Sequence, residues 1–386
     1  MSPGSAAAGL VLDRIRRAGP IGFDEFVDLA LYAPGAGFYE TGGAAGARGG
    51  DFLTSAELGP LFGAVVARAF DTWWRDLGEP DPFVVVEAGA GAGTLCRSVL
   101  DAAPACAPAL RYVMVERSSA LRDRQATSVA VDPPGDLFGP LRRRDEEDDD
   151  GRRVIPGNGP RVTSLADLPA GPLTGVVLAN ELLDNLAFAL VQRRRGRWSE
   201  VRVGEAPGGS LEEVLVDAPA TLASLAATLA PDAPTGARVP IQVAAGRWLA
   251  DALRLLDRGR VVAFDYAVDH TAELAGRAPG GWLRTYRNGG PGGAPLDAPG
   301  GQDITCEVCV DQLARVRAPL LVRDQSEFLA EHGIAELVAA ARAEWHARAS
   351  RPDITALRAR SRLGEAAALT DPAGLGSFRV LEWEVG

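Results

Sequence analysis

The stretch Phe83-Val84-Val85-Val86-Glu87-Ala88-Gly89-Ala90-Gly91-Ala92-Gly93 decides the fold of this 386-residue chain. Its first residues, 83–87, form a short β-branched run that is typical of a strand buried in a parallel sheet. Three glycines follow at alternate positions, and residues 94–102 have a helical pattern. A strand, a glycine loop and a helix in this order predict a backbone that a ligand can approach closely at the carboxyl edge of the sheet.

An acidic residue further along the chain indicates a ligand that contains an adenosine. Glu116 closes the next predicted strand, where a carboxylate can accept hydrogen bonds from both ribose hydroxyls of an adenosine. The spacing Gly-x-Gly-x-Gly, with an acid at Glu87, differs from the dinucleotide pattern, whose third glycine would fall on Thr94. The sequence therefore favours S-adenosyl-L-methionine over NAD, and a tight turn without a ligand is the alternative.

Predicted strands and helices alternate outward from this stretch. An amphipathic helix is predicted over 61–77, because Leu61, Val65, Ala69 and Trp73 are spaced four apart. Strands are predicted over 112–116, 175–180 and 260–266, a hairpin-like region over 189–216 and a terminal strand over 377–385, and regular structure is expected to resume at 161–163. Alternating elements with short buried strands predict an α/β fold with a doubly wound sheet.

Other segments interrupt this core. Residues 1–60 are expected to form an N-terminal cap that is rich in loops from residue 21 onward. The core is assigned to 61–205 and 235–270, with its terminal strand at 377–386. Inserted elements that contact substrate are assigned to 205–235 and 271–376, of which 279–301 is expected to be loop. Residues 132–160 carry the acidic run Asp145 to Asp150 and are expected to form a flexible, solvated insertion.

Composition excludes several classes of function. The 40 cationic residues are all arginines and face 51 acidic residues, so the net charge of −11 leaves no general basic surface for nucleic acid. A chain without lysine also has no lysine base or Schiff base. Residues 1–20 lack a signal-peptide core, and no later apolar run reaches the roughly 18 residues of a spanning helix. We therefore expect a cytoplasmic protein that does not insert into a membrane.

The cysteines predict neither disulfides nor a metal centre. Four cysteines in a chain of this length do not form a disulfide framework. Cys306 and Cys309 form a C-x-x-C pair without a second pair at metal spacing, so we expect buried thiols, with a structural metal as the alternative.

Separated blocks along the chain share the motifs of one family. They are Gly50-Asp51-Phe52-Leu53-Thr54-Ser55, the loop 87–95, Val115-Glu116, Asn180-Glu181-Leu182-Leu183-Asp184 and Gln302-Asp303-Ile304-Thr305. In these blocks the chain resembles the MidA-like class I S-adenosyl-L-methionine-dependent methyltransferases, which include the mitochondrial complex I assembly arginine methyltransferase. The chain departs from the family pattern at Asn185 and Ala187, which replace an alanine and a proline, and at Glu307, which replaces a histidine.

The resemblance implies a Rossmann-like methyltransferase with an added cap and S-adenosyl-L-methionine as its cofactor. It also implies a protein substrate with an acceptor arginine, and a complex I subunit is the first candidate. The residues that the resemblance assigns to the donor are Glu87, Gly89, Gly91, Gly93 and Glu116, with Asp51 and Thr54 lining its pocket from the cap. Asn180, Glu181 and Asp184 are expected to face the acceptor.

Carboxylates at these positions suit an arginine acceptor. A guanidinium is a poor nucleophile, because its charge is delocalised and it stays protonated at neutral pH. Carboxylates that bind two of its nitrogens concentrate charge there and leave the third nitrogen richer in electrons. Glu181 is the first choice, and Asp184 can reach the same face if a helical turn follows. Alternatively, Asp184 caps that turn and Glu181 faces solvent.

Two further functions remain open from the sequence. A non-catalytic assembly factor would keep the fold and the donor site but act by binding a partner. An NAD-dependent oxidoreductase is the weaker alternative, because the glycine spacing disfavours it.

Overall fold

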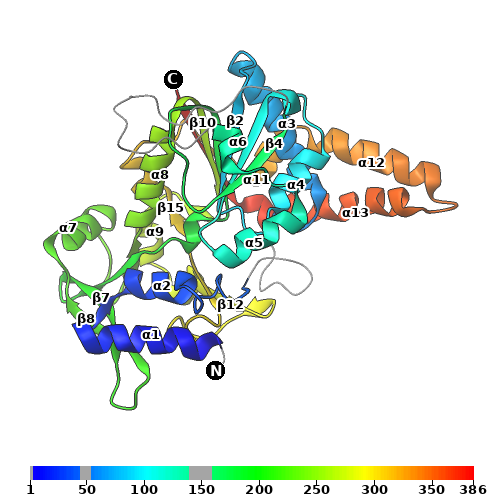
Figure 1. The fold of residues 1–386 in the computed structure, drawn as a ribbon. Helices are drawn as coiled ribbons and strands as arrows, with labels where there is room; N and C mark the ends of the chain where they lie inside the picture. The colour runs from blue at the N-terminus through cyan, green and yellow to red at the C-terminus, as the bar shows by residue number, and fades with distance from the viewer. Residues whose placement is uncertain (1–2, 44–53, 139–158) are drawn as a thin grey trace. The chain divides into compact units, whose positions relative to one another are not determined.

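The computed structural model describes residues 3–43, 54–138 and 159–386, which form two compact units (Figure 1). The first unit comprises Met1–Phe52, Leu182–Asp251 and Asp265–Ala318. The second comprises Leu53–Glu181, Ala252–Phe264 and Pro319–Gly386. The chain passes between the units directly after Glu181 and directly after Phe264. The predicted insertion with its acidic run Asp145 to Asp150 lies largely outside the described residues.

A seven-stranded sheet forms the centre of the second unit, in the order β16-β17-β10-β5-β2-β3-β4. The five strands β10, β5, β2, β3 and β4 pair in parallel, and β16 pairs antiparallel with β17. Strand order therefore reverses between β2 and β5, which is where doubly wound sheets bind their ligands. The strands are β2 (Phe83–Ala88), β3 (Leu110–Val115), β4 (Arg161–Leu165), β5 (Leu173–Asn180), β10 (Leu256–Asp265), β16 (Leu321–Asp324) and β17 (Arg379–Val385).

Helices pack on this sheet around an aromatic core. The helix predicted over 61–77 is confirmed as α3, and its four predicted core positions are all buried. Its aromatic side chains join a cluster with Phe83 of β2 and Phe264 of β10. The helices are α3 (Pro60–Asp76), α4 (Thr94–Asp101), α5 (Ser119–Ser128), α6 (Pro134–Phe138), α11 (Gln325–Glu331), α12 (Ile334–Arg348) and α13 (Ile354–Leu369).

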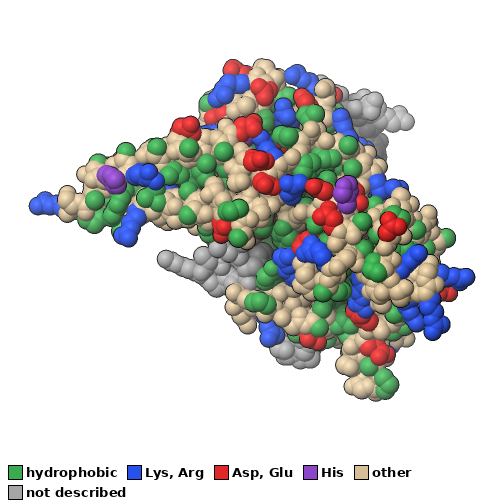
Figure 2. Space-filling model, turned by 180° about the vertical axis from the view of Figure 1, so that it is seen from behind, with side chains coloured by type: hydrophobic (Ala, Val, Ile, Leu, Met, Phe, Trp, Pro, Cys, Tyr) green, Lys and Arg blue, Asp and Glu red, His purple; other side chains and the backbone are tan. Residues whose placement is uncertain are grey.

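The helices α12 and α13 pack along each other as a hairpin that extends away from the sheet of their unit (Figure 1). Hydrophobic side chains are scattered over the surface of this hairpin, with a few arginine side chains among them (Figure 2). Ile354 is 70% exposed and Leu357 is 53% exposed, so part of the apolar surface of α13 faces solvent.

The first unit contains two antiparallel sheets, a parallel pair of short strands, β11 and β15, and several helices. Its five-stranded sheet has the order β1-β7-β6-β9, with β8 paired to β7, and a three-stranded sheet has the order β13-β12-β14. The strands are β1 (Ile21–Gly22), β6 (Ala189–Arg194), β7 (Arg197–Glu205), β8 (Leu211–Asp217), β9 (Arg238–Ile241), β11 (Ala267–Val268), β12 (Leu283–Arg287), β13 (Gly290–Pro291), β14 (Asp303–Cys306) and β15 (Val308–Cys309). The helices that begin in this unit are α1 (Pro3–Ala18), α2 (Phe23–Tyr32), α7 (Ala220–Leu229), α8 (Val243–Leu255), α9 (Thr271–Ala275) and α10 (Val310–Ala314).

Two stretches that were expected to be loops have regular structure. The cap segment from residue 21 contains α2, because Phe23, Phe26, Ala30 and neighbouring apolar residues recur at helical spacing and are buried. Within 279–301, the strand β12 forms because it pairs with β14, which is distant in sequence. Single-sequence patterns miss such elements when glycine-rich turns surround them.

The described cysteines are free and buried, as predicted: Cys96, Cys106, Cys306 and Cys309. Within residues 3–43, 54–138 and 159–386, no group of three acidic, histidine or cysteine side chains could hold a metal ion. Across the same ranges, no helix is long and apolar enough to cross a membrane.

Candidate functional site

The glycine loop leaves the carboxyl end of β2 with its backbone in the left-handed region. Gly89, Gly91 and Gly93 have φ values of 70°, 52° and 80°, which side chains other than glycine rarely adopt. The N–H groups of Gly89 and Ala90 donate to the carbonyl oxygen of Val115, which ties the loop to the end of β3. The loop therefore sits at the point where strand order reverses, as a donor site in a doubly wound sheet requires.

The glycines of this loop serve different purposes. A Cβ atom at Gly91 would meet nothing within 4 Å, so open space lies beside this backbone. A Cβ atom at Gly93 would lie 3.1 Å from Met114 Sδ, so Gly93 is needed for packing against β3. The open face at Gly91 fits a ligand that lies against the backbone, which is how the methionine moiety of S-adenosyl-L-methionine would be held.

Glu116 anchors the other side of the loop. Its Oε2 accepts a hydrogen bond from Gly91 N at 2.9 Å, and its Oε1 accepts one from Ser118 N at 2.8 Å. Gln125, which the sequence analysis missed, donates from Nε2 to Gly91 O at 2.9 Å and accepts from Ser164 Oγ. Since the helical period places Gln125 on the buried face of α5, its side chain fixes the loop that Glu116 faces.

Glu87 lies in the core at the end of β2 and is 3% exposed. The Tyr112 hydroxyl donates to its Oε2 at 2.7 Å. Burial nevertheless raises the pKa of Glu87 to about 8, so this carboxyl is mainly protonated at neutral pH. Its predicted role as a ligand to the donor stays a prediction.

A turn at residues 54–58 connects the glycine loop to the end of β5. Thr94, at the start of α4, donates from Oγ1 to Glu57 at 2.7 Å. Ser55 donates from its backbone N to Glu181 Oε1 at 2.8 Å. Thr54 is 8% exposed and begins this turn, and its carbonyl oxygen accepts hydrogen bonds from the N–H groups of Glu57 and Leu58. Asp51, the other residue predicted to line the donor pocket from the cap, lies outside the described residues.

Glu181 follows β5 in a conformation that is uncommon for a residue with a side chain. Its φ is 51°, and its N–H donates to Phe264 O at 2.8 Å. Residues held in this region are strained and often lie at functional sites. Asn180 donates to Glu181 Oε1 at 3.4 Å, while its own Oδ1 is buried without a hydrogen-bond partner among the described residues.

Asp184 lies in the 3-10 turn Leu183–Asn185 of the first unit and is 4% exposed. The turn is capped by Asp265, whose Oδ2 accepts from the N–H groups of Leu183 and Asp184 at 2.9 and 3.3 Å. Tyr266 donates from its hydroxyl to Asp184 Oδ2 at 2.7 Å. Burial raises the pKa of Asp184 to about 6.

A second buried carboxyl belongs to the same group of side chains. Asp303 is fully buried, and its Oδ1 accepts from Tyr39 OH and from Asn185 Nδ2, both at 3.0 Å. Burial and the charge of Asp184 raise the pKa of Asp303 to about 7. We refer to Asp184 and Asp303 as the acid pair. The sequence placed Asp303 in a family block but gave it no role, because its partners come from distant segments.

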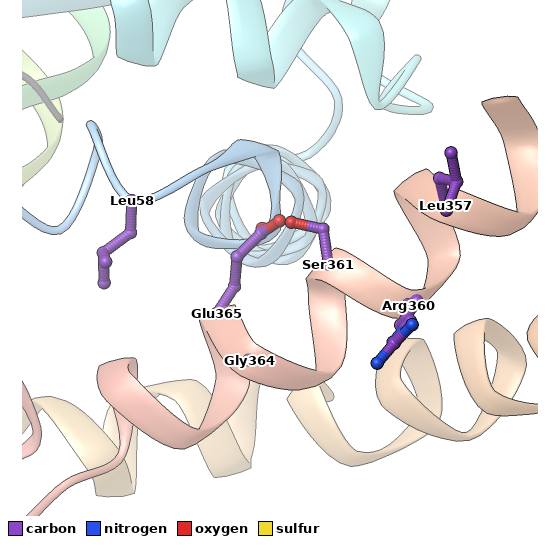
Figure 3. Close-up of a pocket in the computed structure, with 6 residues that line it drawn as sticks. All are labelled: Leu58, Leu357, Arg360, Ser361, Gly364 and Glu365. Atoms are coloured by element: carbon purple, nitrogen blue, oxygen red, sulfur yellow. The ribbon is translucent and has the colours of Figure 1, made fainter. Parts of the chain in front are cut away.

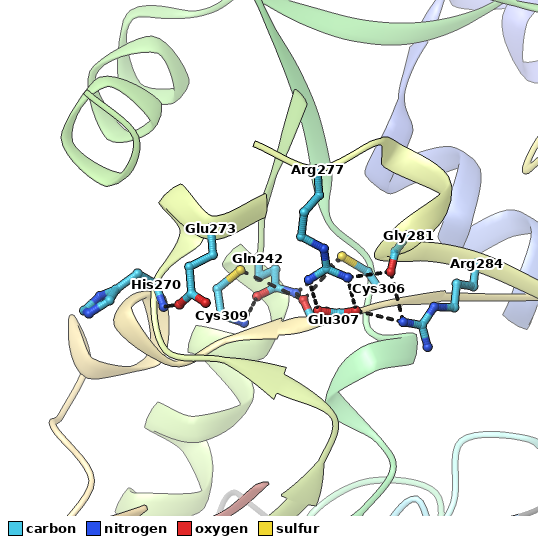
Figure 4. A network of polar contacts seen from close by, with 9 residues as sticks. All are labelled: Gln242, His270, Glu273, Arg277, Gly281, Arg284, Cys306, Glu307 and Cys309. Atoms are coloured by element: carbon cyan, nitrogen blue, oxygen red, sulfur yellow. Dashed lines mark hydrogen bonds and ion pairs between the residues drawn. The ribbon is translucent and has the colours of Figure 1, made fainter. Parts of the chain in front are cut away.

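Glu307 has a structural role that its position after the Asp-Ile-Thr motif did not reveal. It accepts from both terminal nitrogens of Arg277 at 2.7 Å and from Arg284 at 2.9 Å (Figure 4). Gln242 donates to the Glu307 carbonyl at 2.9 Å and joins this network to Cys309. The polar groups of these residues form hydrogen bonds with one another, and these bonds help to hold the strands β14 and β15 in place.

A surface hollow lies along α13, and the carboxylate in its lining caps the start of α3. Its lining includes Leu58, Arg360 and Glu365 (Figure 3). Glu365 accepts from Leu61 N at 2.9 Å and thereby satisfies a backbone N–H at the start of α3. Since this carboxylate is already engaged by the chain, the hollow is not a candidate for the catalytic site.

The doubly wound sheet, the glycine loop and Glu116 together define a class of protein that binds an adenosine-containing methyl donor. Residues 65–321 match the family described as S-adenosyl-L-methionine-dependent methyltransferases. The chain belongs to this family, which confirms the predicted fold class, family and cofactor and disfavours the NAD alternative.

Relatives and solved structures agree with this membership. The chain is 32% identical over 205 residues to the fruit-fly protein arginine methyltransferase NDUFAF7 homolog, mitochondrial, which covers 52% of this chain and 45% of that protein. It is 28% identical to the bovine protein arginine methyltransferase NDUFAF7, mitochondrial, over 83% of this chain and 72% of that protein. In the first of these matches, the chain spans about half the length of its curated relative.

A crystal structure of similar fold comes from Burkholderia thailandensis. This COG1565 superfamily member was solved with bound S-adenosyl-homocysteine and has a TM-score of 0.79 and 26% identity, over 99% of this chain and 92% of that chain. Its ligand is the demethylated form of S-adenosyl-L-methionine.

The prediction of a cytoplasmic location, which rests on the sequence alone, is wrong. The fruit-fly, mouse and bovine relatives are named as mitochondrial proteins. The composition of residues 1–20 and the hydropathy of the later segments therefore do not assign a chain of this family to the cytoplasm.

Proposed function

We propose that this chain is a protein arginine N-methyltransferase, with a subunit of respiratory complex I as the first candidate acceptor. The observation that carries the proposal is the backbone site at Gly91, with open space beside it and Glu116 behind it. The names of the relatives support arginine as the acceptor residue.

The residues of the second unit would hold the donor. Gly89, Gly91 and Gly93 present a backbone without side chains, and Glu116 would accept hydrogen bonds from the ribose hydroxyls. S-adenosyl-L-methionine supplies a methyl group on a sulfonium, which a nitrogen can accept by in-line displacement without a metal.

The carboxylates after β5 would prepare the acceptor. Glu181 is proposed to accept hydrogen bonds from the guanidinium and to concentrate its positive charge on the bound nitrogens. Asp184 is a further candidate carboxylate for the acceptor. Asn180 has a buried oxygen that lacks a donor among the described residues, so it suits a third hydrogen bond from the acceptor group.

Replacement of the first-choice carboxylate tests the activity. We expect Glu181→Gln to lower the rate of methyl transfer to a purified candidate subunit by about 100-fold, because a neutral amide cannot concentrate the guanidinium charge. Binding of S-adenosyl-homocysteine, measured by calorimetry, should stay within about twofold of the parent. The matched control is Glu384→Gln, since Glu384 is exposed on the strand β17 of the same unit.

Cells with and without the gene test the acceptor. Mass spectrometry of complex I subunits should find an arginine that is methylated only when the gene is present. Identical methylation in both would reject complex I as the substrate. If the parent protein transfers no methyl group and Glu181→Gln retains full function in cells, a non-catalytic assembly factor is the better description.

A further inference from the structure

Among the described residues of the first unit, no cationic side chain forms an ion pair with the acid pair. One oxygen of each carboxyl is bound by the chain, while Asp184 Oδ1 and Asp303 Oδ2 are buried and have no hydrogen-bond partner among the described residues. Two buried carboxyl oxygens without donors indicate a group that brings N–H donors from outside.

The two carboxyls are close enough to affect each other's ionisation. The charge of Asp184 contributes to the raised pKa of Asp303, and the charges of both carboxylates raise the pKa of Tyr39. Ionising both groups without a cation would leave two like charges in a site that water does not reach. A cation that binds here would therefore stabilise the ionised form of both.

The surrounding charged and titratable groups do not provide that cation. Tyr39 stacks on Tyr32, with ring centroids 5.4 Å apart, and Tyr266 donates to Asp184. The carboxylate of Asp265 accepts backbone N–H groups, and Cys306 is a buried thiol with a raised pKa. The guanidinium of Arg284 lies over the Tyr266 ring, 5.6 Å from its centroid, and donates to Glu307. In the described ranges, no arginine forms an ion pair with Asp184 or Asp303.

We propose that the acid pair binds the guanidinium group of the acceptor arginine, with Asp303 as the second carboxylate of the site. A guanidinium is planar and carries five N–H donors, so it can satisfy Asp184 Oδ1 and Asp303 Oδ2 together. The inference rests on the proposed function, since arginine is the acceptor there. It goes beyond that function, because it adds Asp303 of β14 to the carboxylates that are proposed to bind the acceptor.

Binding at this site must release protons. In the absence of the cation, the raised pKa values keep the pair partly protonated near neutral pH. The arginine stays charged throughout, because its own pKa exceeds about 12. When it binds, the two carboxyls ionise and their protons pass to solvent, while no covalent bond forms or breaks.

Calorimetric titration of the full chain tests this proposal. The probe is N-acetyl-arginine amide, titrated in the presence of saturating S-adenosyl-homocysteine, and the neutral analogue N-acetyl-citrulline amide is the comparison. We expect the arginine probe to bind about 100-fold more weakly at about pH 5.5 than at about pH 8, since both carboxyls must ionise. Titrations in two buffers of different ionisation enthalpy should show proton release. The citrulline probe should bind at least about tenfold more weakly at the higher pH.

Variants separate a binding role from a purely structural one. For Asp303→Asn we expect about tenfold weaker binding at about pH 8 and a pH effect of about fourfold or less, because only Asp184 still titrates. Tyr39→Phe keeps both carboxyls and removes a donor to Asp303, which raises the pKa of Asp303. The pH at which the arginine probe begins to bind tightly should therefore be higher than in the parent. Tyr39→Phe keeps the test decisive if Asp303→Asn does not fold. Asp232→Asn, at an exposed position of the same unit, should behave as the parent does.

Each result bears on one of the two proposals. Binding of the arginine probe that does not depend on pH, or equal binding of citrulline, overturns the role of the acid pair. Methyl transfer to an arginine that persists unchanged in Asp303→Asn overturns it as well and leaves the proposed function intact. Proton-linked binding without methyl transfer supports the guanidinium site and rejects the proposed activity.

Discussion

The glycine loop of the second unit and the acid pair of the first unit are built in opposite ways. The loop is made of backbone from consecutive residues, and its one carboxylate, Glu116, is bound by two backbone N–H groups. The acid pair is made of side chains from distant segments, and each of its carboxyls keeps a buried oxygen without a donor among the described residues. A satisfied loop is preorganised for its ligand, whereas the acid pair costs free energy until a cation binds.

Filling the open space beside the glycine loop should have the greatest effect on ligand binding. Gly91→Ala places a methyl group in the open space beside the loop and should weaken binding of S-adenosyl-homocysteine by about 100-fold, because the ligand would occupy that space. Calorimetric titration measures the effect. The variant should also lose about 1 kcal/mol of stability, since alanine is strained at a φ of 52°.

Gly209→Ala is the matched control for this variant. Gly209 has a φ of 79° and nothing within 4 Å of its Cβ position, but it lies in the turn between β7 and β8. It should lose the same stability without any change in ligand binding. If both variants bind S-adenosyl-homocysteine as the parent does, the open space at Gly91 is not the donor site.

Removing one carboxyl of the acid pair should change how the stability of the protein depends on pH. Asp303 has a pKa of about 7 in the fold against an ordinary value of 3.8, so the unfolded state loses its proton first as the pH rises. Its contribution to stability therefore falls between about pH 4 and pH 7. We expect Asp303→Asn to be more stable than the parent by about 2 kcal/mol at about pH 8, and by much less at about pH 4.

Urea unfolding across this pH range measures the difference, with Asp232→Asn as the control. Equal pH dependence in the parent and in Asp303→Asn would contradict the assignment. A variant that gains stability while it loses arginine binding would show that the acid pair is kept for its ligand rather than for the fold.

The two regions also differ in how much the sequence predicts. The strand at 83–87, the loop and Glu116 are close in sequence and follow local rules, so their arrangement was predicted from their spacing. The acid pair depends on β14 pairing with β12 inside a stretch that was expected to be loop. Tyr39 and Asp303 are far apart in the chain, and no local pattern predicts that they share a hydrogen bond.

Glu87 is the residue for which sequence and structure suggest different roles, and its replacement has the smallest expected effect. The sequence assigns it to the donor, whereas the fold buries it against Tyr112 with a pKa of about 8. Since the ordinary value is 4.5, the contribution of Glu87 to stability falls as the pH rises from about 4.5 to about 8. Glu87→Gln should therefore gain about 1 kcal/mol near pH 8 in urea unfolding and nothing near pH 4.

The affinity for S-adenosyl-homocysteine distinguishes these two roles of Glu87. A neutral core group predicts that Glu87→Gln binds this ligand within about twofold of the parent, because the amide oxygen still accepts from Tyr112. A carboxylate that binds the amino group of the donor predicts about tenfold weaker binding instead. Tyr112→Phe supplies the control, since it removes the hydrogen bond and raises the pKa of Glu87 without removing the carboxyl. If Glu87→Gln weakens binding and Tyr112→Phe does not, the buried acid belongs to the donor site, and that site depends on a side chain as the acid pair does.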